Sequence, residues 1–191
     1  MELANINTLK KILSSEGFNL KKALGQNFLI DPSVCPAMAE NACDKETGVL
    51  EIGPGAGVLT RSLCDKAKKV VAIELDTKLK PVLAKTLADK DNVEVIFGDA
   101  MKLDLKKIIE EKFSHCHRVA VCANLPYYIT SPIIMYLLES RLPIDNITVM
   151  VQKEAAERLC AKVGSREAGA VTVAVDYYSK GEILFLVDRE S

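Results

Sequence analysis

Residues 49–57 read Val-Leu-Glu-Ile-Gly-Pro-Gly-Ala-Gly, and this stretch decides the fold class. Its first four residues, three of them apolar, predict a buried strand, and the glycines after them predict a turn that a ligand can approach closely. A second apolar run, residues 70–73, ends on Glu74. A strand, a glycine turn, a helix, a strand and a final carboxylate are typical of a nucleotide-binding βαβ unit, in which Glu74 accepts hydrogen bonds from ribose hydroxyls.

The spacing of the glycines narrows the choice of ligand. Gly53, Gly55 and Gly57 follow the pattern G-x-G-x-G, and Val58 stands where dinucleotide-binding proteins have a further glycine. This departure favours a ligand without a pyrophosphate, such as S-adenosylmethionine. A glycine turn of this kind also occurs as a plain connection between elements, so the loop alone leaves both interpretations open.

A second informative stretch, Asn124-Leu125-Pro126-Tyr127, closes the apolar run of residues 119–123. In open parallel sheets, ligands bind beyond the carboxyl ends of the strands. The side-chain oxygen of Asn124 and the carbonyl of Leu125 can each accept one hydrogen of an exocyclic amine on a flat ring. Pro126 fixes the turn, and Tyr127 offers a face on which that ring can stack. These four residues are therefore the predicted catalytic residues.

Strands and helices are predicted to alternate along most of the chain, which indicates an α/β fold with a doubly wound, mostly parallel sheet and helices on both faces. The predicted strands lie at about 49–53, 70–74, 93–97, 118–123 and 147–151, and the predicted helices at about 58–67, 77–90, 104–112, 132–140 and 152–161. A further strand is predicted at 183–187. The stretch Ala170–Tyr178 is ambiguous, because its β-branched residues favour a strand while its apolar spacing favours a helix.

The domain organisation predicted from this pattern is one domain over residues 1–191. Residues 1–47 form an N-terminal arm with two short helices, one within residues 1–20 and one that begins at Asp31-Pro32 and runs to about Cys43. Residues 48–191 form the Rossmann-like core. Within that core the strand at 93–97 ends on Gly98-Asp99-Ala100, where Asp99 is either a turn residue or an acceptor for the amino group of a bound adenine.

Composition indicates an ordinary globular protein, with 191 residues and a formal net charge of −1. That charge gives no global signature of nucleic-acid binding, so any RNA-binding surface must be local. Modest basic excesses surround Lys21 and Lys22, and again Arg158 and Lys162. Each is either a solvated face or an RNA-binding surface, and charge alone does not decide between them.

Three patterns bear on metal, membrane and location. None of the six cysteines forms a C-x-x-C pair, which indicates reduced thiols in a cytosolic core, and His115-Cys116-His117 has no matching second ligand pair, so no metal site is expected. Residues 119–138 carry no charge and are long enough to span a bilayer, but polar residues and prolines at their centre favour a strand, a loop and a helix. No signal peptide is recognised, and a cytoplasmic protein is expected.

Four motifs now stand in order at suitable separations. They are Leu-Gly-Gln-Asn-Phe-Leu at 24–29, Glu-Ile-Gly-Pro-Gly-Ala-Gly at 51–57, Asn-Leu-Pro-Tyr-Tyr at 124–128 and Val-Gln-Lys-Glu-Ala-Ala-Glu-Arg-Leu at 151–159. Together they resemble the KsgA family of ribosomal RNA adenine N6-dimethyltransferases, from about Gly17 to Val187.

The resemblance implies a class I methyltransferase fold, S-adenosylmethionine as cofactor, and two adjacent adenosines near the 3′ end of small-subunit rRNA as substrate, in a pre-30S-type ribosomal particle. It implies a helix at 170–178. A monomer without metal is expected. Carried over by position, the cofactor-binding residues are Asn27 and Leu29 at the border of the cofactor, Gly53 under its methionine part with Gly55 in the same loop, Glu74 at its ribose, Asp99 facing its adenine with Ala100 next to it, and Asn124 between cofactor and target base.

The sequence departs from the family at its end. Family members continue past the equivalent of Val187 into a Phe-x-Pro-x-Pro segment, a last strand and a helical C-terminal domain, so the chain is expected to be a fragment whose 183–187 strand lacks its neighbour. Three alternatives stay open: an Erm-type methyltransferase of large-subunit rRNA, a DNA N6-adenine methyltransferase, and a non-catalytic RNA-binding or assembly relative.

Overall fold

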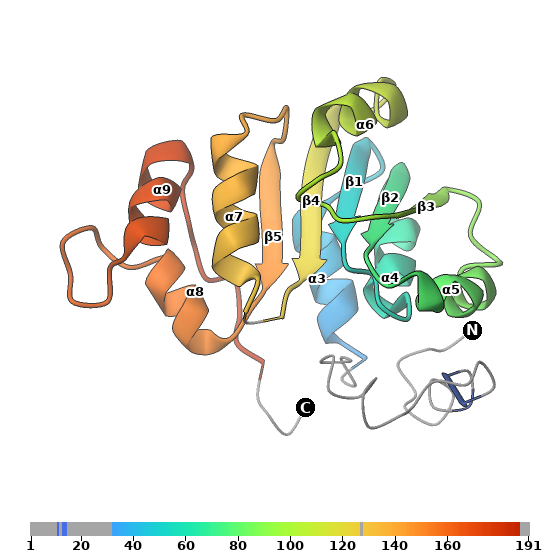
Figure 1. Cartoon of the computed structure of the whole chain (residues 1–191), viewed down its shortest axis with the longest axis horizontal. Helices are drawn as coiled ribbons and strands as arrows, with labels where there is room; N and C mark the ends of the chain where they lie inside the picture. Colours follow the sequence, from blue (N-terminus) through green and yellow to red (C-terminus); the bar gives the residue numbers. More distant parts are fainter. Residues whose placement is uncertain (1–10, 12, 15–31, 127, 188–191) are drawn as a thin grey trace.

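Five parallel strands lie at the centre of the protein, in the order β3-β2-β1-β4-β5 (Figure 1). The computed structural model describes Lys11, Leu13, Ser14 and residues 32–126 and 128–187. The strands are β1 (Thr47–Ile52), β2 (Lys69–Glu74), β3 (Val93–Phe97), β4 (Arg118–Asn124) and β5 (Asn146–Met150). Each lies within two residues of its predicted position, so the prediction of a parallel, doubly wound sheet is confirmed.

The middle strand, β1, is paired on both sides. It runs parallel to β2 from Gly48↔Lys69 to Ile52↔Ile73, and parallel to β4 up to Ile52↔Ala123. All six residues of β1 are buried. A parallel strand that is covered on both faces has a continuous apolar sequence rather than an alternating one, and this explains the run that begins at Val49.

Helices cover both faces of this sheet (Figure 1). One face packs against α3 (Val34–Ala42) and α4 (Val58–Lys66) through side chains such as Val49 and Leu63. The other packs against α6 (Leu105–Lys112) and α7 (Thr130–Glu139) through Leu50 and Ile133. Because successive side chains of a strand point to opposite faces, neighbouring residues of β1 enter different cores.

The remaining helices lie at the edges of these layers. They are the short 3₁₀-helix η1 (Thr77–Leu79), α5 (Lys80–Thr86), α8 (Lys153–Leu159) and α9 (Ala170–Tyr178). The helix at 170–178 is the one that the family resemblance implied. Its start is held by the Thr172 hydroxyl, which accepts a hydrogen bond from the Gly169 N–H at 2.9 Å and donates one to the Arg158 carbonyl at 2.6 Å.

Two predicted helix boundaries differ from those observed. The helix predicted at 77–90 divides into η1 and α5 and ends at Thr86. The helix predicted from Asp31-Pro32 begins at Val34, with Ser33 in the capping position, while Asp31 lies outside the described residues. Most of the helix predicted within residues 1–20 also lies outside them.

The prediction of a strand at 183–187 is wrong. Residues 181–187 have no regular secondary structure, and the five apolar side chains from Ile183 to Val187 are each more than a third exposed. A strand exists only through ladder hydrogen bonds to a neighbour, and among the described residues β5 pairs with β4 alone. The apolar composition of residues 183–187 favours a strand, but the described residues supply no neighbouring strand with which it could pair.

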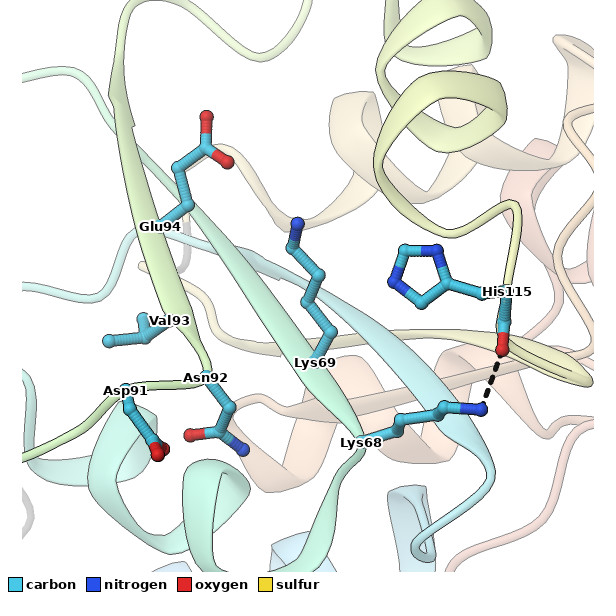
Figure 2. A pocket seen from close by; sticks show the side chains of 7 residues that line it. All are labelled: Lys68, Lys69, Asp91, Asn92, Val93, Glu94 and His115. Atoms are coloured by element: carbon cyan, nitrogen blue, oxygen red, sulfur yellow. Dashed lines mark hydrogen bonds between the residues drawn. The ribbon is translucent and has the colours of Figure 1, made fainter.

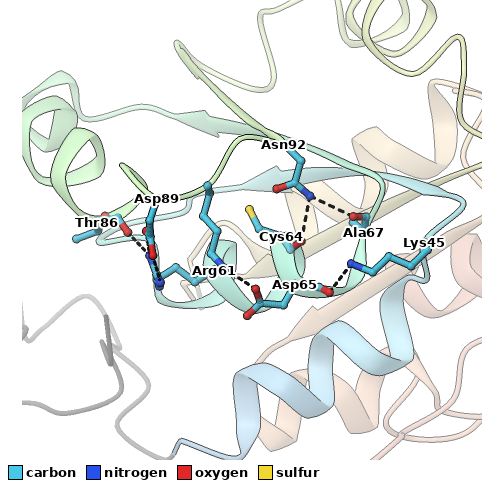
Figure 3. A network of polar contacts seen from close by, with 9 residues as sticks. Lys45, Arg61, Cys64, Asp65, Ala67, Thr86, Asp89 and Asn92 are labelled. Carbon is cyan, nitrogen blue, oxygen red and sulfur yellow. Dashed lines mark hydrogen bonds and ion pairs between the residues drawn. The ribbon is translucent and has the colours of Figure 1, made fainter.

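A polar network ties α4 to the segment between α5 and β3 (Figure 3). The Arg61 guanidinium donates to both carboxylate oxygens of Asp89, at 2.5 and 2.8 Å, and to the Thr86 carbonyl at 2.6 Å. The Asn92 amide donates to the carbonyls of Cys64 and Ala67. The Arg61 bonds thus hold the first turn of α4, which follows the glycine loop, and the Asn92 bonds hold its last turn.

The uncharged stretch of residues 119–138 divides into β4, a turn and α7, as predicted. Within the described part of the chain, no helix is both long and apolar enough to cross a membrane. All six cysteines are free thiols, and Cys35, Cys64 and Cys122 are buried.

Candidate functional site

The predicted site segments meet at one edge of the sheet. Because the strands are parallel, their carboxyl ends lie together, and the strand order places Asp99, Glu74, Gly53 and Asn124 after four consecutive strands. The strands that follow β1 are first added on one side of it, as β2 and β3, and then on the other, as β4 and β5, so the strand order switches between β1 and β4, where Ile52 pairs with Ala123. Such a switch point is where open α/β sheets bind ligands.

The glycine loop between β1 and α4 uses left-handed backbone geometry. Gly53 has φ 72° and Gly57 has φ 86°, a region that residues with a side chain rarely adopt. A Cβ at Gly57 would lie 3.0 Å from the Thr86 hydroxyl, so this glycine allows α5 to pack closely. At Gly53 the described part of the chain, apart from the neighbours in sequence, places no atom within 4 Å of the Cβ position, so open space remains there.

Glu74 connects the end of β2 to this loop. One of its carboxylate oxygens accepts a hydrogen bond from the Gly55 N–H at 3.1 Å, and the other accepts one from the Asp76 N–H at 2.8 Å. Burial raises the pKa of Glu74, and the hydrogen bonds from Asp76 and Gly55 act in the opposite direction. The carboxylate is thus fixed in place, and each oxygen keeps a lone pair for a further donor.

Glu51, on β1, is a residue that the sequence analysis missed. Its side chain is 1% exposed, and neither carboxylate oxygen has a hydrogen-bond partner among the described residues. Burial raises the pKa of Glu51 to about 8; the nearby Thr60 hydroxyl lowers it, although it does not reach hydrogen-bonding geometry, and Glu74 raises it further. A charged residue inside an apolar strand was the signal that could have revealed it.

The ends of β2 and β3 also carry two exposed apolar side chains. Leu75 is 68% exposed directly after Glu74, and Met101 is 39% exposed beside Asp99. Asp99 itself accepts a hydrogen bond from the Met101 N–H at 3.0 Å and lies 3.5 Å from the Lys102 ammonium, so it does act as a turn residue. The two apolar side chains form candidate faces for a flat ring, and sequence reasoning overlooked them because it sought polar groups.

The end of β4 leaves an acceptor available. The Leu125 side chain is buried and its N–H donates to the Met150 carbonyl at 3.1 Å, while its own carbonyl accepts no hydrogen bond among the described residues. The Pro126 carbonyl accepts from the Ile129 N–H at 3.1 Å and from the Thr130 hydroxyl at 3.0 Å, which starts α7. Asn124 is half-buried beside this turn.

Several predicted site residues lie outside the described part of the chain. These are Lys21, Lys22, Asn27, Leu29 and Tyr127. Of the predicted RNA-binding residues that are described, Arg158 lies on α8 and Lys162 just after it, and both are exposed. The helix α8 begins just after the carboxyl end of β5 (Figure 1).

A pocket of about 410 Å³ lies at the opposite edge, where β2 and β3 begin (Figure 2). Two lysines, Lys68 and Lys69, face acidic residues there, and the Lys68 ammonium donates to the His115 carbonyl at 2.7 Å. None of the predicted site residues lines this pocket. The strand ends, and not this pocket, therefore carry the candidate chemistry.

Comparison with known proteins identifies the family of this chain. The sequence profile of the family described as "Ribosomal RNA adenine dimethylase" matches residues 17–191. The protein named ribosomal RNA small subunit methyltransferase A is 48% identical over 189 residues in Geobacillus thermodenitrificans and 49% identical over 181 residues in Bacillus pumilus. These alignments cover 98% and 94% of this chain but only 64% and 62% of the relatives, so the chain spans less than two thirds of their length.

Two solved structures share the fold. The 23S rRNA methyltransferase ErmE is 32% identical, with a TM-score of 0.60 over 72% of this chain and 53% of that protein. A dimethyladenosine transferase from Plasmodium falciparum is 35% identical, with a TM-score of 0.60 over 76% of this chain and 50% of that protein. The five-stranded sheet is therefore a Rossmann-like methyltransferase fold, and the chain belongs to the ribosomal RNA adenine dimethylase family.

Proposed function

We propose that this chain is the catalytic part of an enzyme that transfers methyl groups from S-adenosylmethionine to N6 of two adjacent adenosines near the 3′ end of small-subunit rRNA. One observation carries the proposal: the available carbonyl of Leu125 and the side chain of Asn124 stand at the switch point, on the strand next to the glycine loop. An amine acceptor pair and a nucleotide-binding loop meet there, as N6 methylation requires.

The described residues fit S-adenosylmethionine. Gly53 leaves room among the described residues for its methionine part, and Gly55 is proposed to border the same part. Glu74 keeps acceptor capacity for its ribose, and Asp99 and Ala100 are proposed to border its adenine. Leu75 and Met101 offer apolar faces to that ring. Asn27 and Leu29 are proposed as further cofactor contacts from the N-terminal arm.

When bound, S-adenosylmethionine supplies an electrophilic methyl group on a sulfonium. The amino nitrogen of adenine is a weak nucleophile, because its lone pair is delocalised into the ring. The Asn124 oxygen and the Leu125 carbonyl accept its two hydrogens, which orients the nitrogen and favours a more tetrahedral geometry. Catalysis thus comes from orientation and placed dipoles, and the methylated nitrogen loses its proton without a strong base.

The target base must leave its stack to reach this site. Pro126 fixes the turn, and Tyr127 is proposed to replace part of the lost stacking. Lys21, Lys22, Arg158 and Lys162 are proposed to contact phosphates, and the two described members of this set, Arg158 and Lys162, are exposed. The enzyme is proposed to act as a cytoplasmic monomer, without metal, on a pre-30S-type particle in ribosome biogenesis.

The identity of nearly one half to the small-subunit relatives supports this substrate over large-subunit rRNA. The likeness to ErmE keeps large-subunit rRNA as the second candidate, with the same chemistry at the same site.

A chimera with a full-length relative tests the proposed activity. Residues 17–187 replace the matching part of the Bacillus pumilus protein, and methyl transfer is measured on small-subunit particles, large-subunit RNA and DNA. We expect N6,N6-dimethyladenosine in the small-subunit RNA alone. Transfer to large-subunit RNA or to DNA in its place would contradict the assigned substrate. Failure of this chain to bind S-adenosylmethionine would contradict the assigned cofactor.

A further inference from the structure

In the described part of the chain, four buried polar side-chain atoms make no hydrogen bond, and three of them lie in one place. They are both carboxylate oxygens of Glu51 and the hydroxyl oxygen of Thr60, in the first turn of α4. A buried carboxylate that lacks a partner is costly in its charged form, by several kcal/mol in typical cases. Such a group is therefore kept neutral by a proton unless a positive charge comes near.

The groups around Glu51 supply no such charge. On β2 it faces Glu74, on α4 it faces Thr60 and Cys64, and on β4 it faces Cys122, the residue with which it pairs. The thiols of Cys43 and Cys35 lie beyond Cys122. Burial raises the pKa of Cys64 and of Cys122, so these thiols are neutral as well. Every described group that shifts the pKa of Glu51 is neutral or negative.

Glu51 is also placed to sense the ligand of the glycine loop. It precedes Gly53 by two residues, and Glu74, which acts on it electrostatically, is hydrogen-bonded to Gly55. The surrounding core is apolar, and charges interact more strongly across a medium of low dielectric constant than in water. A change of charge in the bound ligand therefore reaches this carboxyl group.

We infer that Glu51 distinguishes the sulfonium cofactor from its thioether product by charge, and that it does so by exchanging one proton with solvent. The inference rests on the proposed function, which supplies both ligands. Without cofactor, Glu51 is protonated. The positive charge of S-adenosylmethionine favours the carboxylate, so the proton passes to solvent when the cofactor binds. Once the methyl group has left, the sulfur is neutral and Glu51 recovers a proton from solvent. The electrostatic attraction between the Glu51 carboxylate and the bound ligand is then lost.

The consequence is a preference that depends on pH. Below the pKa of Glu51, binding of the cation must expel a proton, and this weakens its affinity. Above that pKa the carboxylate is already charged, and the cation binds more tightly. The product lacks the sulfonium charge, so its affinity changes less. The ratio of cofactor affinity to product affinity therefore rises with pH.

Calorimetry on the chain measures this ratio directly. Affinities for S-adenosylmethionine and S-adenosylhomocysteine are compared at about pH 6.5 and about pH 8.5, with the number of released protons taken from buffers of different ionisation enthalpy. We expect the affinity ratio to rise by up to about tenfold for each unit by which the cation lowers the pKa of Glu51. Proton release should be larger for the cofactor than for the product.

Glu51→Gln is the decisive variant, because glutamine keeps the shape of a protonated glutamate and cannot ionise. We expect its affinity ratio to be the same at both pH values. The ligand's own amino group titrates equally in both proteins, so its contribution cancels in the comparison. Glu110→Gln, at an exposed position on α6, removes the same charge elsewhere and should behave as the wild type does.

A second variant, Thr60→Val, should keep the pH dependence of the affinity ratio but shift it along the pH scale. Thr60→Val removes the hydroxyl that lowers the pKa of Glu51, so the rise in the affinity ratio should move to higher pH. A ratio that changes equally with pH in wild type and Glu51→Gln would overturn the inference while leaving the cofactor assignment intact. Absence of cofactor binding in the wild type would instead contradict the proposed function. Thermal unfolding of each variant verifies that it is folded.

Discussion

The two sides of the switch point differ in how their polar groups are used. On the β1–β2 side, both oxygens of Glu74 already accept backbone hydrogen bonds, one of them from the glycine loop. On the β4 side, the Leu125 carbonyl accepts no hydrogen bond among the described residues, and the Pro126 turn holds it in place. The first side thus holds its carboxylate in a fixed position, and the second leaves a backbone acceptor that the target amine would occupy under the proposed function.

The largest expected effect is a loss of kcat on substitution of Asn124, on the β4 side, with little change in cofactor affinity. Asn124→Ala in the chimera should lower kcat by about 10²–10³-fold, roughly 3–4 kcal/mol, because it removes an acceptor that acts mainly in the transition state. Cofactor affinity should change less than about threefold. Single-turnover methylation and calorimetry measure the two quantities. Asn41→Ala, at an exposed position on α3, is the matched control, and a preserved kcat would show that the β4 side has another role.

The next effect concerns stability on the β1 side and follows from the raised pKa of Glu51. Its pKa rises from 4.5 to about 8 on folding, so the folded chain holds a proton that the unfolded chain releases in this range. The stability of the wild type relative to Glu51→Gln should therefore be greatest below about pH 4.5, fall as the pH rises to about 8, and stay level above that value. The total change is several kcal/mol, because each unit by which folding raises the pKa corresponds to about 1.4 kcal/mol.

Denaturant unfolding over this pH range measures the difference between the two proteins. Parallel curves for the two proteins would mean that Glu51 has a partner in solution. The β1 side would then carry no buried carboxyl group without a partner, and the inferred proton exchange would lose its basis.

Glu74 should affect binding and leave chemistry nearly unchanged. Glu74→Ala is expected to weaken S-adenosylmethionine binding by about 1–3 kcal/mol, since it removes charge-assisted hydrogen bonds to the ribose and the link to Gly55. At saturating cofactor, kcat should stay close to that of the wild type. Glu74→Gln, which keeps one acceptor oxygen, should lose less affinity. Calorimetry that finds equal affinity for Glu74→Ala would remove this residue from the ribose site.

The smallest effect is expected at Tyr127, where stacking needs the ring and not the hydroxyl. Tyr127→Phe should keep activity within about threefold of the wild type, whereas Tyr127→Ala should lose about 1–3 kcal/mol, the usual contribution of one stacked base. Steady-state methylation of small-subunit particles gives both values. Equal losses in the two variants would assign the role to the hydroxyl instead of the ring.

Local sequence patterns predicted most of the elements because each signal is contained in a few residues. The apolar run from Val49 predicts a buried strand wherever it is placed, and the glycines after it predict a turn. Boundaries were less certain: α3 starts at Val34, and the segment after Thr86 leaves the helix. The segment 183–187 shows the limit most clearly, since its residues favour a strand but a strand requires a partner elsewhere in the chain.

Local patterns in the sequence were enough to predict that strands and helices alternate, that a glycine turn follows β1, and that Glu74, Asp99 and Asn124 stand at strand ends. The fold was needed to show that these ends adjoin in one order, that Glu74 is bonded to Gly55, and that the Glu51 carboxyl group has no hydrogen-bond partner among the described residues. The two kinds of information differ in the distance along the chain over which they act. Propensity and periodicity act between neighbours in the sequence, whereas burial and hydrogen-bond partners depend on residues that folding brings together from distant parts of the chain.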